Sequence, residues 1–163
     1  MIKLLVAAQP KSYILLDPFG GAVNRIASDA IAFPHRDSLY AIEYFVDWNR
    51  GDDVNRDEYM SWVRNLYKYM TPYASKGPRA VYVNNVDLDP GIVDWRKPGL
   101  SGPQAVKLAR AWGDKYFLGN YNRLVKAKTK IDPFNGFNNP QSIPPLVSLV
   151  TSDGIEEGMI DVI

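Results

Sequence analysis

The sequence contains no cysteine and only one histidine, His35. The absence of cysteine excludes disulfides, thiol nucleophiles and thiolate-bound zinc or iron–sulfur centres within this chain. With one histidine, a histidine-based metal site or a serine–histidine–aspartate triad would depend entirely on His35. That residue stands between a proline and an arginine in a segment expected to be a loop. A loop histidine with structural hydrogen bonds is the simpler interpretation, and no metal site is predicted.

The sequence also lacks an excess of charge of either sign and any long apolar run. Its 19 Lys and Arg residues against 18 Asp and Glu residues give a formal net charge of +1. This balance provides no global attraction to nucleic acid or to a membrane surface, so neither is predicted as a partner. No apolar run approaches the roughly 18 to 20 residues that span a bilayer. The N-terminal stretch has no hydrophobic region or cleavage site typical of a signal peptide.

The order of the expected elements indicates an α+β fold. Residues 12–17 and 39–48 read as strands, residues 79–86 as a third strand, and residues 23–33 as a short strand followed by a loop. Helices are expected over residues 55–71, 101–117 and 121–130, with a pause at Gly119-Asn120 between the last two. Long strands alternating with helices predict an antiparallel sheet with helices packed on one face.

Capping and stop signals set the expected helix boundaries. Asn55 with Glu58, and Ser101 with Gln104, have the spacing of capping boxes. Residues 4–8 read as the end of a helix that stops before Pro10, so the chain is expected to open partway through an element. Residues 132–146 are rich in proline, asparagine and glycine, which predicts an ordered but irregular segment. Residues 147–163 are expected to form a tail.

Glu43 is the principal catalytic candidate. Alternation along the strand LYAIEYFVDW places Glu43 between Ala41 and Phe45 on one face, opposite a face of Tyr40, Ile42, Tyr44, Val46 and Trp48 that reads as core. A carboxylate between apolar neighbours is partly desolvated, and this favours its use as a general base. The alternative is a solvated or ion-paired glutamate at a sheet edge, which is the commoner role of a charged residue on a strand.

Three further patterns are candidate sites. Tyr82, Asn84 and Asn85 form a polar cluster on an otherwise apolar segment, and buried amides need partners that a ligand can supply. The basic run from Arg123 to Lys130 is interleaved with apolar residues, which favours the solvated face of an amphipathic helix over an anion site. The glycines of PFGG lack the lysine and hydroxyl residue that a phosphate-binding loop requires.

From about Ser12 to Leu146, the sequence carries in order the segments PFGGAVNRI, FPHR, PRAVYVNNVDLDPG, WGDKYFLGNYNRLVKAKTKIDPFNGF and NNPQSIPPL. In their order and spacing, these segments resemble the plant berberine bridge enzyme family of FAD-linked oxidoreductases. Glu43 in its place on the strand is similar to the alkaloid-oxidising, reticuline oxidase branch. The resemblance implies the C-terminal portion of such an enzyme, with residues 1–131 as part of the substrate domain. It also implies that residues 132–146 return to the missing N-terminal FAD domain.

The resemblance also implies roles for individual residues and for the cofactor. Glu43 matches the catalytic base that deprotonates a substrate phenol, and Tyr82 and Asn84 match a tyrosine and an asparagine near the flavin ring. Asn85 falls at a substrate-binding position that is histidine in the alkaloid branch and tyrosine in many other members. Because asparagine is not a base, this departure affects substrate choice. The residues that attach FAD covalently lie outside this chain, in agreement with its lack of cysteine.

The function implied is oxidation of a benzylisoquinoline-type alkaloid, with hydride transfer to FAD and reoxidation by O2. The isolated chain is expected to be inactive, because the flavin domain is missing. Family members enter the secretory pathway, and the resemblance implies the same localisation for this protein. Two alternatives remain open. One is the carbohydrate- or alcohol-oxidising branch of the same family, with which Asn85 is compatible. The other is a truncated non-catalytic protein that binds a ligand or partner.

Overall fold

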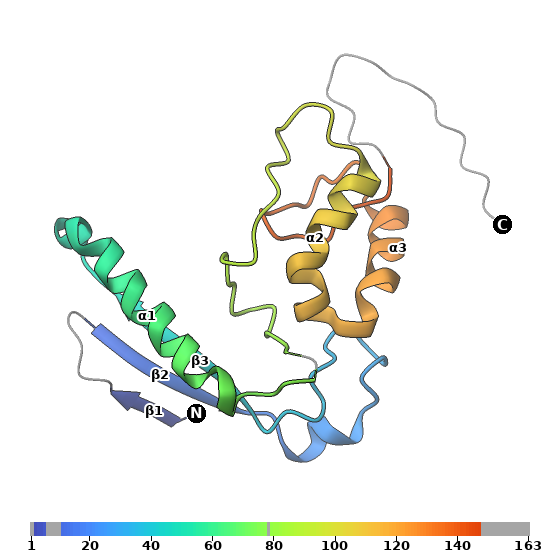
Figure 1. Ribbon diagram of the computed structural model, residues 1–163. Helices are drawn as coiled ribbons and strands as arrows, with labels where there is room; N and C mark the ends of the chain where they lie inside the picture. The colour runs from blue at the N-terminus through green and yellow to red at the C-terminus, as the bar shows by residue number, and fades with distance from the viewer. Residues whose placement is uncertain (1, 6–10, 78, 148–163) are drawn as a thin grey trace. The chain divides into compact units, whose positions relative to one another are not determined.

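In the computed structural model, the described residues are 2–5, 11–77 and 79–147. The chain divides into two compact units, Met1–Val86 and Asp87–Ile163 (Figure 1). The first unit holds the strands and one α-helix, and the second holds two α-helices with the irregular segments around them. The finer division expected from sequence, at residues 131 and 146, stays a prediction.

The sheet of the first unit is antiparallel throughout. Its strands are β1 (Ile2–Leu5), β2 (Lys11–Pro18) and β3 (Tyr40–Asp47), in the spatial order β1-β2-β3. The register pairs Leu15 with Glu43, and Tyr13 with Phe45. Paired residues share a face of a sheet, so Glu43 has Leu15 as its direct cross-strand neighbour.

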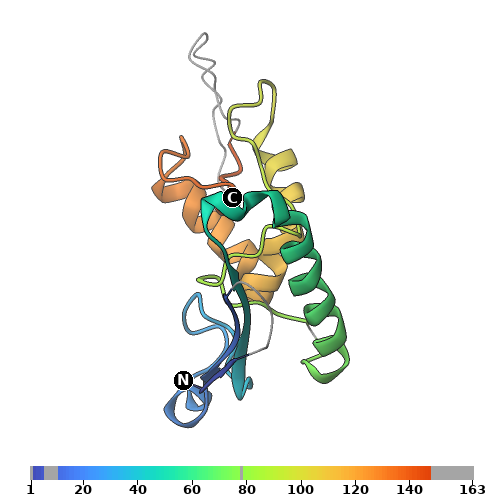
Figure 2. The same cartoon turned by 90° about the vertical axis from the view of Figure 1, so that its left-hand side faces the viewer.

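Helix α1 (Arg56–Met70) covers one face of this sheet. It runs beside β3 in both views (Figures 1 and 2) and follows the short 3-10 helix η2 (Arg50–Asn55). The ring of Tyr44 meets that of Tyr67 on α1 edge to face, with centroids 6.0 Å apart. Strand alternation therefore puts Ile42, Tyr44 and Val46 toward α1 and Glu43 on the opposite face. The predicted α+β class with an antiparallel sheet is confirmed.

Four local predictions in the first unit are wrong. Leu4 and Leu5 belong to strand β1, because this segment finds a ladder partner in β2; the rest of the expected helix, residues 6–8, lies outside the described residues. Residues 23–33 contain no strand: the chain instead forms the 3-10 helix η1 (Gly21–Arg25) and a loop. Asn55 makes no cap, since its side-chain amide donates to Asp52 Oδ1 instead, at 2.8 Å.

The fourth correction concerns residues 79–86, which are irregular and not a strand. Among the described residues, no strand pairs with this segment. The backbone N–H of Asn85 donates to the carbonyl oxygen of Tyr82 at 2.9 Å, and this closes a turn. Without a neighbouring strand, the backbone N–H and C=O groups of such a segment form hydrogen bonds within turns instead of a β-ladder.

The second unit is built on α2 (Gly102–Phe117) and α3 (Tyr121–Ile131), which pack against each other and are joined by the 3-10 helix η4 (Leu118–Asn120). The predicted capping box at Ser101 and Gln104 is present, with both reciprocal hydrogen bonds. The predicted pause at Gly119-Asn120 is also confirmed. The buried apolar residues of this unit come from both helices and from the segments before and after them: Val93, Ala105, Ala109, Trp112, Tyr116, Phe117, Tyr121, Val125, Pro144 and Pro145.

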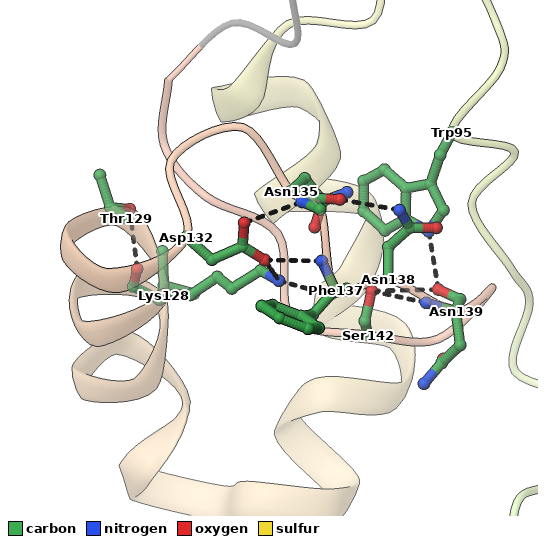
Figure 3. A network of polar contacts seen from close by, with 11 residues as sticks. Trp95, Lys128, Thr129, Asp132, Asn135, Phe137, Asn138, Asn139 and Ser142 are labelled. Atoms are coloured by element: carbon green, nitrogen blue, oxygen red, sulfur yellow. Dashed lines mark hydrogen bonds and ion pairs between the residues drawn. The ribbon is translucent and has the colours of Figure 1, made fainter.

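The irregular segment after α3 is held in place by side chains. The buried amide of Gln141 accepts from the Tyr116 hydroxyl at 2.7 Å and donates to the carbonyl oxygens of Asp87 at 2.6 Å and Gly91 at 2.8 Å. Figure 3 shows the neighbouring network, in which Trp95 Nε1 donates to the Asn139 carbonyl at 2.7 Å. These bonds confirm the prediction of an ordered, irregular segment, which packs within the second unit.

Candidate active site

Glu43 lies at the middle of β3, on the face directed away from α1. Its side chain is half-buried, and its neighbours on this face are Leu15 across the ladder and Ala41 and Phe45 along the strand. Among the described side chains, none forms a hydrogen bond or ion pair with the Glu43 carboxylate. The structure therefore places a single carboxylate in a largely apolar part of the sheet, as the strand pattern predicts.

An aromatic pair adjoins Glu43 on the same face. Tyr13 and Phe45 stack with ring centroids 4.6 Å apart and an interplanar angle of 17°. Phe45 is 40% exposed, and Tyr13 is half-buried. Neither strand pattern by itself identifies this pair. The alternation of SYILLD and LYAIEYFVDW puts both rings on the Glu43 face, but only the register brings them opposite each other.

Tyr82 and Asn84 are brought into direct contact. The Asn84 side-chain amide donates to the Tyr82 hydroxyl at 2.8 Å. The Tyr82 ring packs edge to face against Phe19 and Phe33, with centroids 5.7 Å and 5.6 Å away. Because the hydroxyl accepts the amide proton, its own proton is left to donate to another group. The pair thus presents a rigidly held phenol and an exposed amide.

The aromatic cluster under Tyr82 joins the polar pair to the start of β3. Phe19 donates its backbone N–H to the Leu39 carbonyl at 2.9 Å, immediately before β3 begins. Leu39 and Glu43 are four positions apart, which corresponds to about 13 Å along a strand. Tyr82 and Asn84 are therefore anchored near the beginning of the strand that carries Glu43. No direct hydrogen bond links Glu43 with the predicted cofactor residues in the described part of the chain.

Asn85 is half-buried next to this pair, and its backbone closes the turn that carries Tyr82 and Asn84. His35 is buried in the loop that precedes β3 and meets the Phe33 ring edge to face at 5.3 Å. Its neighbour Arg36 is also buried, with its guanidinium over the same ring at 4.9 Å. These contacts agree with a structural role for the single histidine. The burial of Arg36 was not signalled by the sequence.

The basic run from Arg123 to Lys130 forms most of α3. Val125 is buried, whereas Arg123 and Lys126 are exposed. This distribution confirms the amphipathic-helix interpretation of the run. Within the described residues, no group of three or more histidine or acidic side chains is arranged to hold a metal ion. In that same part of the chain, no helix is long and apolar enough to cross a membrane.

Comparison with known proteins identifies the family. Residues 81–144 match the profile of the family described as "Berberine and berberine like". A protein of Nicotiana tabacum, berberine bridge enzyme-like C-1, is 48% identical over 145 residues, which cover 83% of this chain and 26% of that relative. Reticuline oxidase of Eschscholzia californica is 43% identical over 144 residues, which cover 88% of this chain and 27% of the enzyme.

Solved structures agree in fold. A variant of berberine bridge enzyme in complex with (S)-reticuline matches with a TM-score of 0.77 and 44% identity, over 85% of this chain and 28% of that one. A grass pollen allergen with glucose dehydrogenase activity matches with a TM-score of 0.67 and 34% identity, over 84% of this chain and 27% of that one. The chain spans about a quarter of the length of the curated relatives it matches.

The matched fold defines the class of protein to which this chain is similar, the berberine bridge enzyme-like proteins of plants. By its matched residues 81–144, the chain belongs to the berberine and berberine-like family.

Proposed function

We propose that this chain supplies the catalytic base and part of the substrate site of an FAD-dependent oxidase of the reticuline oxidase type. The observation that supports the proposal most directly is Glu43, a half-buried carboxylate whose neighbours on its sheet face are Leu15, Ala41 and Phe45. In the whole enzyme, Glu43 removes a proton from a phenol of a benzylisoquinoline-type substrate as positive charge develops at the carbon that is oxidised. Such proton transfer contributes about 10²–10⁴-fold to the rate.

The polar pair fits the edge of a flavin ring. Tyr82 and Asn84 together offer a phenolic donor, an amide donor and an amide acceptor, held by the packing of Tyr82 against two aromatic rings. These are the groups that pair with the carbonyl and N–H edge of an isoalloxazine. FAD, when bound, would supply the acceptor for a hydride from the substrate carbon, with O2 as the final oxidant. The residues of this chain orient the substrate and the ring, and Asn85 contributes to the substrate side.

The rest of the enzyme is part of the same proposal. The proposal assigns the FAD domain, with the covalent attachment residues, to the portion of the relatives that this chain does not match, and expects no oxidase activity from the chain alone. Members of the family enter the secretory pathway, and the same localisation is proposed here. Asn85 stands where the alkaloid branch has histidine and many other members have tyrosine, and this departure bears on substrate choice.

Substrate-dependent hydrogen peroxide release tests which branch the site belongs to. The matched part of Eschscholzia californica reticuline oxidase is replaced by this chain, and the FAD-loaded chimera is given (S)-reticuline or an oligosaccharide. The proposal predicts peroxide with reticuline and none above background with the sugar. Peroxide release with the oligosaccharide alone would favour the carbohydrate branch. The similarity to the grass pollen allergen with glucose dehydrogenase activity is the reason to test this branch.

A non-catalytic binding protein is the second candidate. It is favoured by Phe134 and Phe137, which are 87% and 86% exposed in the segment after α3. Large exposed apolar groups often mark contact sites for partners. Tight binding of an alkaloid by the purified chain without FAD would favour this function. Monomeric behaviour without any affinity for such ligands would count against it.

A further inference from the structure

We infer that the Tyr13–Phe45 stack is a specificity-determining element that seats an aromatic ring of the substrate beside Glu43. The inference rests on the proposed function and adds two residues that neither the sequence motifs nor the family resemblance assigned. It selects hydroxylated aromatic compounds over sugars as the substrate class.

The position of the stack supports this role. Glu43 and Phe45 are two residues apart on β3, and Tyr13 is the cross-strand partner of Phe45. Residues i and i+2 of a strand point to the same face, about 7 Å apart. That separation corresponds to about one hydroxylated aromatic ring, so a ring held at Phe45 can direct its hydroxyl group to the Glu43 carboxylate. The contact needed for proton transfer is a hydrogen bond of about 2.6–3.2 Å.

The exposure of the rings supports it as well. The stack at 4.6 Å covers one face of Phe45, and 40% of that residue remains exposed. β3 is the edge strand of the described sheet, so no further strand of that sheet flanks Phe45 on its other side. The rings are also directed away from α1, which contacts the opposite face through Tyr44. An aromatic ligand can therefore extend an existing stack.

The polarity of the surroundings favours an aromatic substrate over a carbohydrate. The neighbours of Glu43 on this face are Leu15, Ala41 and the two rings. Asp17, opposite Ala41, and Asp47, which follows Phe45, lie further along the same face. A sugar offers several hydroxyl groups that each need a partner, and Leu15 and Ala41 beside Glu43 supply none. An aromatic ring with one phenol needs only the stack and one acceptor.

The test uses the complete 163-residue chain and (S)-reticuline as the probe, without FAD. Because the flavin side of the site is absent, binding is expected to be weak, and chemical-shift changes in a two-dimensional NMR titration to about 10 mM ligand detect dissociation constants in the millimolar range. Phe45→Leu keeps an apolar side chain but removes the ring, and is expected to weaken binding about threefold to tenfold. Tyr13→Leu is expected to act in the same direction.

Tyr40→Leu is the matched control, because Tyr40 is 51% exposed on the same strand but belongs to the other face. This substitution should leave binding unchanged. Absence of any binding by the parent chain, or equal affinities of the parent and Phe45→Leu, would overturn the inference. If the stack only stabilises the sheet, Phe45→Leu lowers the unfolding midpoint without changing affinity. Tight, micromolar binding would overturn the proposed oxidase role and leave the stack as the ligand contact.

The FAD-loaded chimera separates this inference from the proposed function. Oxidation of reticuline with a KM that Phe45→Leu does not change would contradict the role of the stack and leave the oxidase assignment intact. Absence of oxidation, combined with ring-dependent binding by the chain, would contradict the oxidase assignment and leave the stack as a binding element. A raised KM with little change in kcat is the result expected if both are right.

Discussion

Single side chains stabilise the irregular parts of this molecule, and Asp132 is the best example. Its carboxylate pairs with Lys128 and accepts the backbone N–H groups of Gly136 at 2.8 Å and Phe137 at 3.0 Å (Figure 3). Lys128 also donates to the Phe137 carbonyl at 2.5 Å. The hydrogen bond from Lys128, with those from the two N–H groups, holds the pKa of Asp132 below its ordinary value.

This lowered pKa makes stability depend on pH in a defined direction. The unfolded chain protonates Asp132 near its ordinary pKa of about 3.9, and the folded chain only at lower pH. Ionised Asp132 therefore stabilises the fold fully above about pH 4, and this contribution is lost as the pH falls through the lowered folded pKa. Urea unfolding of Asp132→Asn and the parent should show a stability gap at neutral pH that shrinks in acid.

Asp94→Asn is the control for this experiment, because Asp94 pairs with Arg96 at an exposed position. Exposed ion pairs contribute little to stability, so this variant should follow the parent closely at every pH. A gap between Asp132→Asn and the parent that stays constant with pH would mean that the carboxylate's charge is not what stabilises the segment.

At the scale of elements, the contact between α2 and α3 requires a residue without a side chain. A Cβ atom at Gly113 would lie 2.2 Å from Cε2 of Tyr121. Tyr121 is 1% exposed, its hydroxyl donates to the Val106 carbonyl at 2.9 Å, and burial raises its pKa to about 12. The ring is fixed by these contacts and cannot withdraw without breaking them. The close approach of the helices therefore depends on Gly113.

Gly113→Ala is expected to lower the free energy of unfolding by about 1–3 kcal/mol, the usual cost of overpacking. Gly119→Ala is the matched control, since nothing lies within 4 Å of a Cβ built at Gly119. Its effect should stay within about 0.5 kcal/mol. Denaturant unfolding of both variants measures the difference. Equal stabilities would show that Tyr121 can move aside at little cost.

Helices and paired strands were predictable where the local signals agree with the tertiary contacts. The cap at Ser101, the apolar spacing of α1 and the break at Gly119 are encoded within a few residues, and each is found in the structure. Residues 79–86 have the composition of a strand, but a strand also needs a partner, which no local pattern supplies. The helix expected at Leu4 is wrong for the opposite reason, because this segment forms backbone hydrogen bonds with β2 and so becomes a strand.

The candidate site was predictable in part. Alternation alone places Glu43 on the face opposite Tyr44, and the contact of Tyr44 with α1 agrees. The stack of Tyr13 on Phe45 depends on the register between two strands joined by a long connection, and that register cannot be read from either strand. The bond between Asn84 and Tyr82 depends on a turn where a strand was expected. Long-range pairing thus determines what sequence reasoning missed.

At the scale of the whole molecule, the chain corresponds to about a quarter of its relatives and carries one side of the proposed site. The sheet contributes Glu43 and the aromatic stack, and the segment after α1 contributes Tyr82, Asn84 and Asn85. Under the proposed function, the chemistry that requires an electron acceptor belongs to the portion of the relatives outside this match. The proposal thus makes catalysis a property of the assembled enzyme and assigns acid–base and positioning groups to this chain.

The most direct test of this account is the rate of flavin reduction by (S)-reticuline, measured by anaerobic stopped-flow absorbance in the chimera. Glu43→Gln is expected to slow reduction about 10²–10⁴-fold, because the amide cannot accept the phenol proton. Glu58→Gln, at an exposed position on α1, should reduce the flavin at the parent rate. Reduction of the Glu43→Gln enzyme at the parent rate would contradict the account.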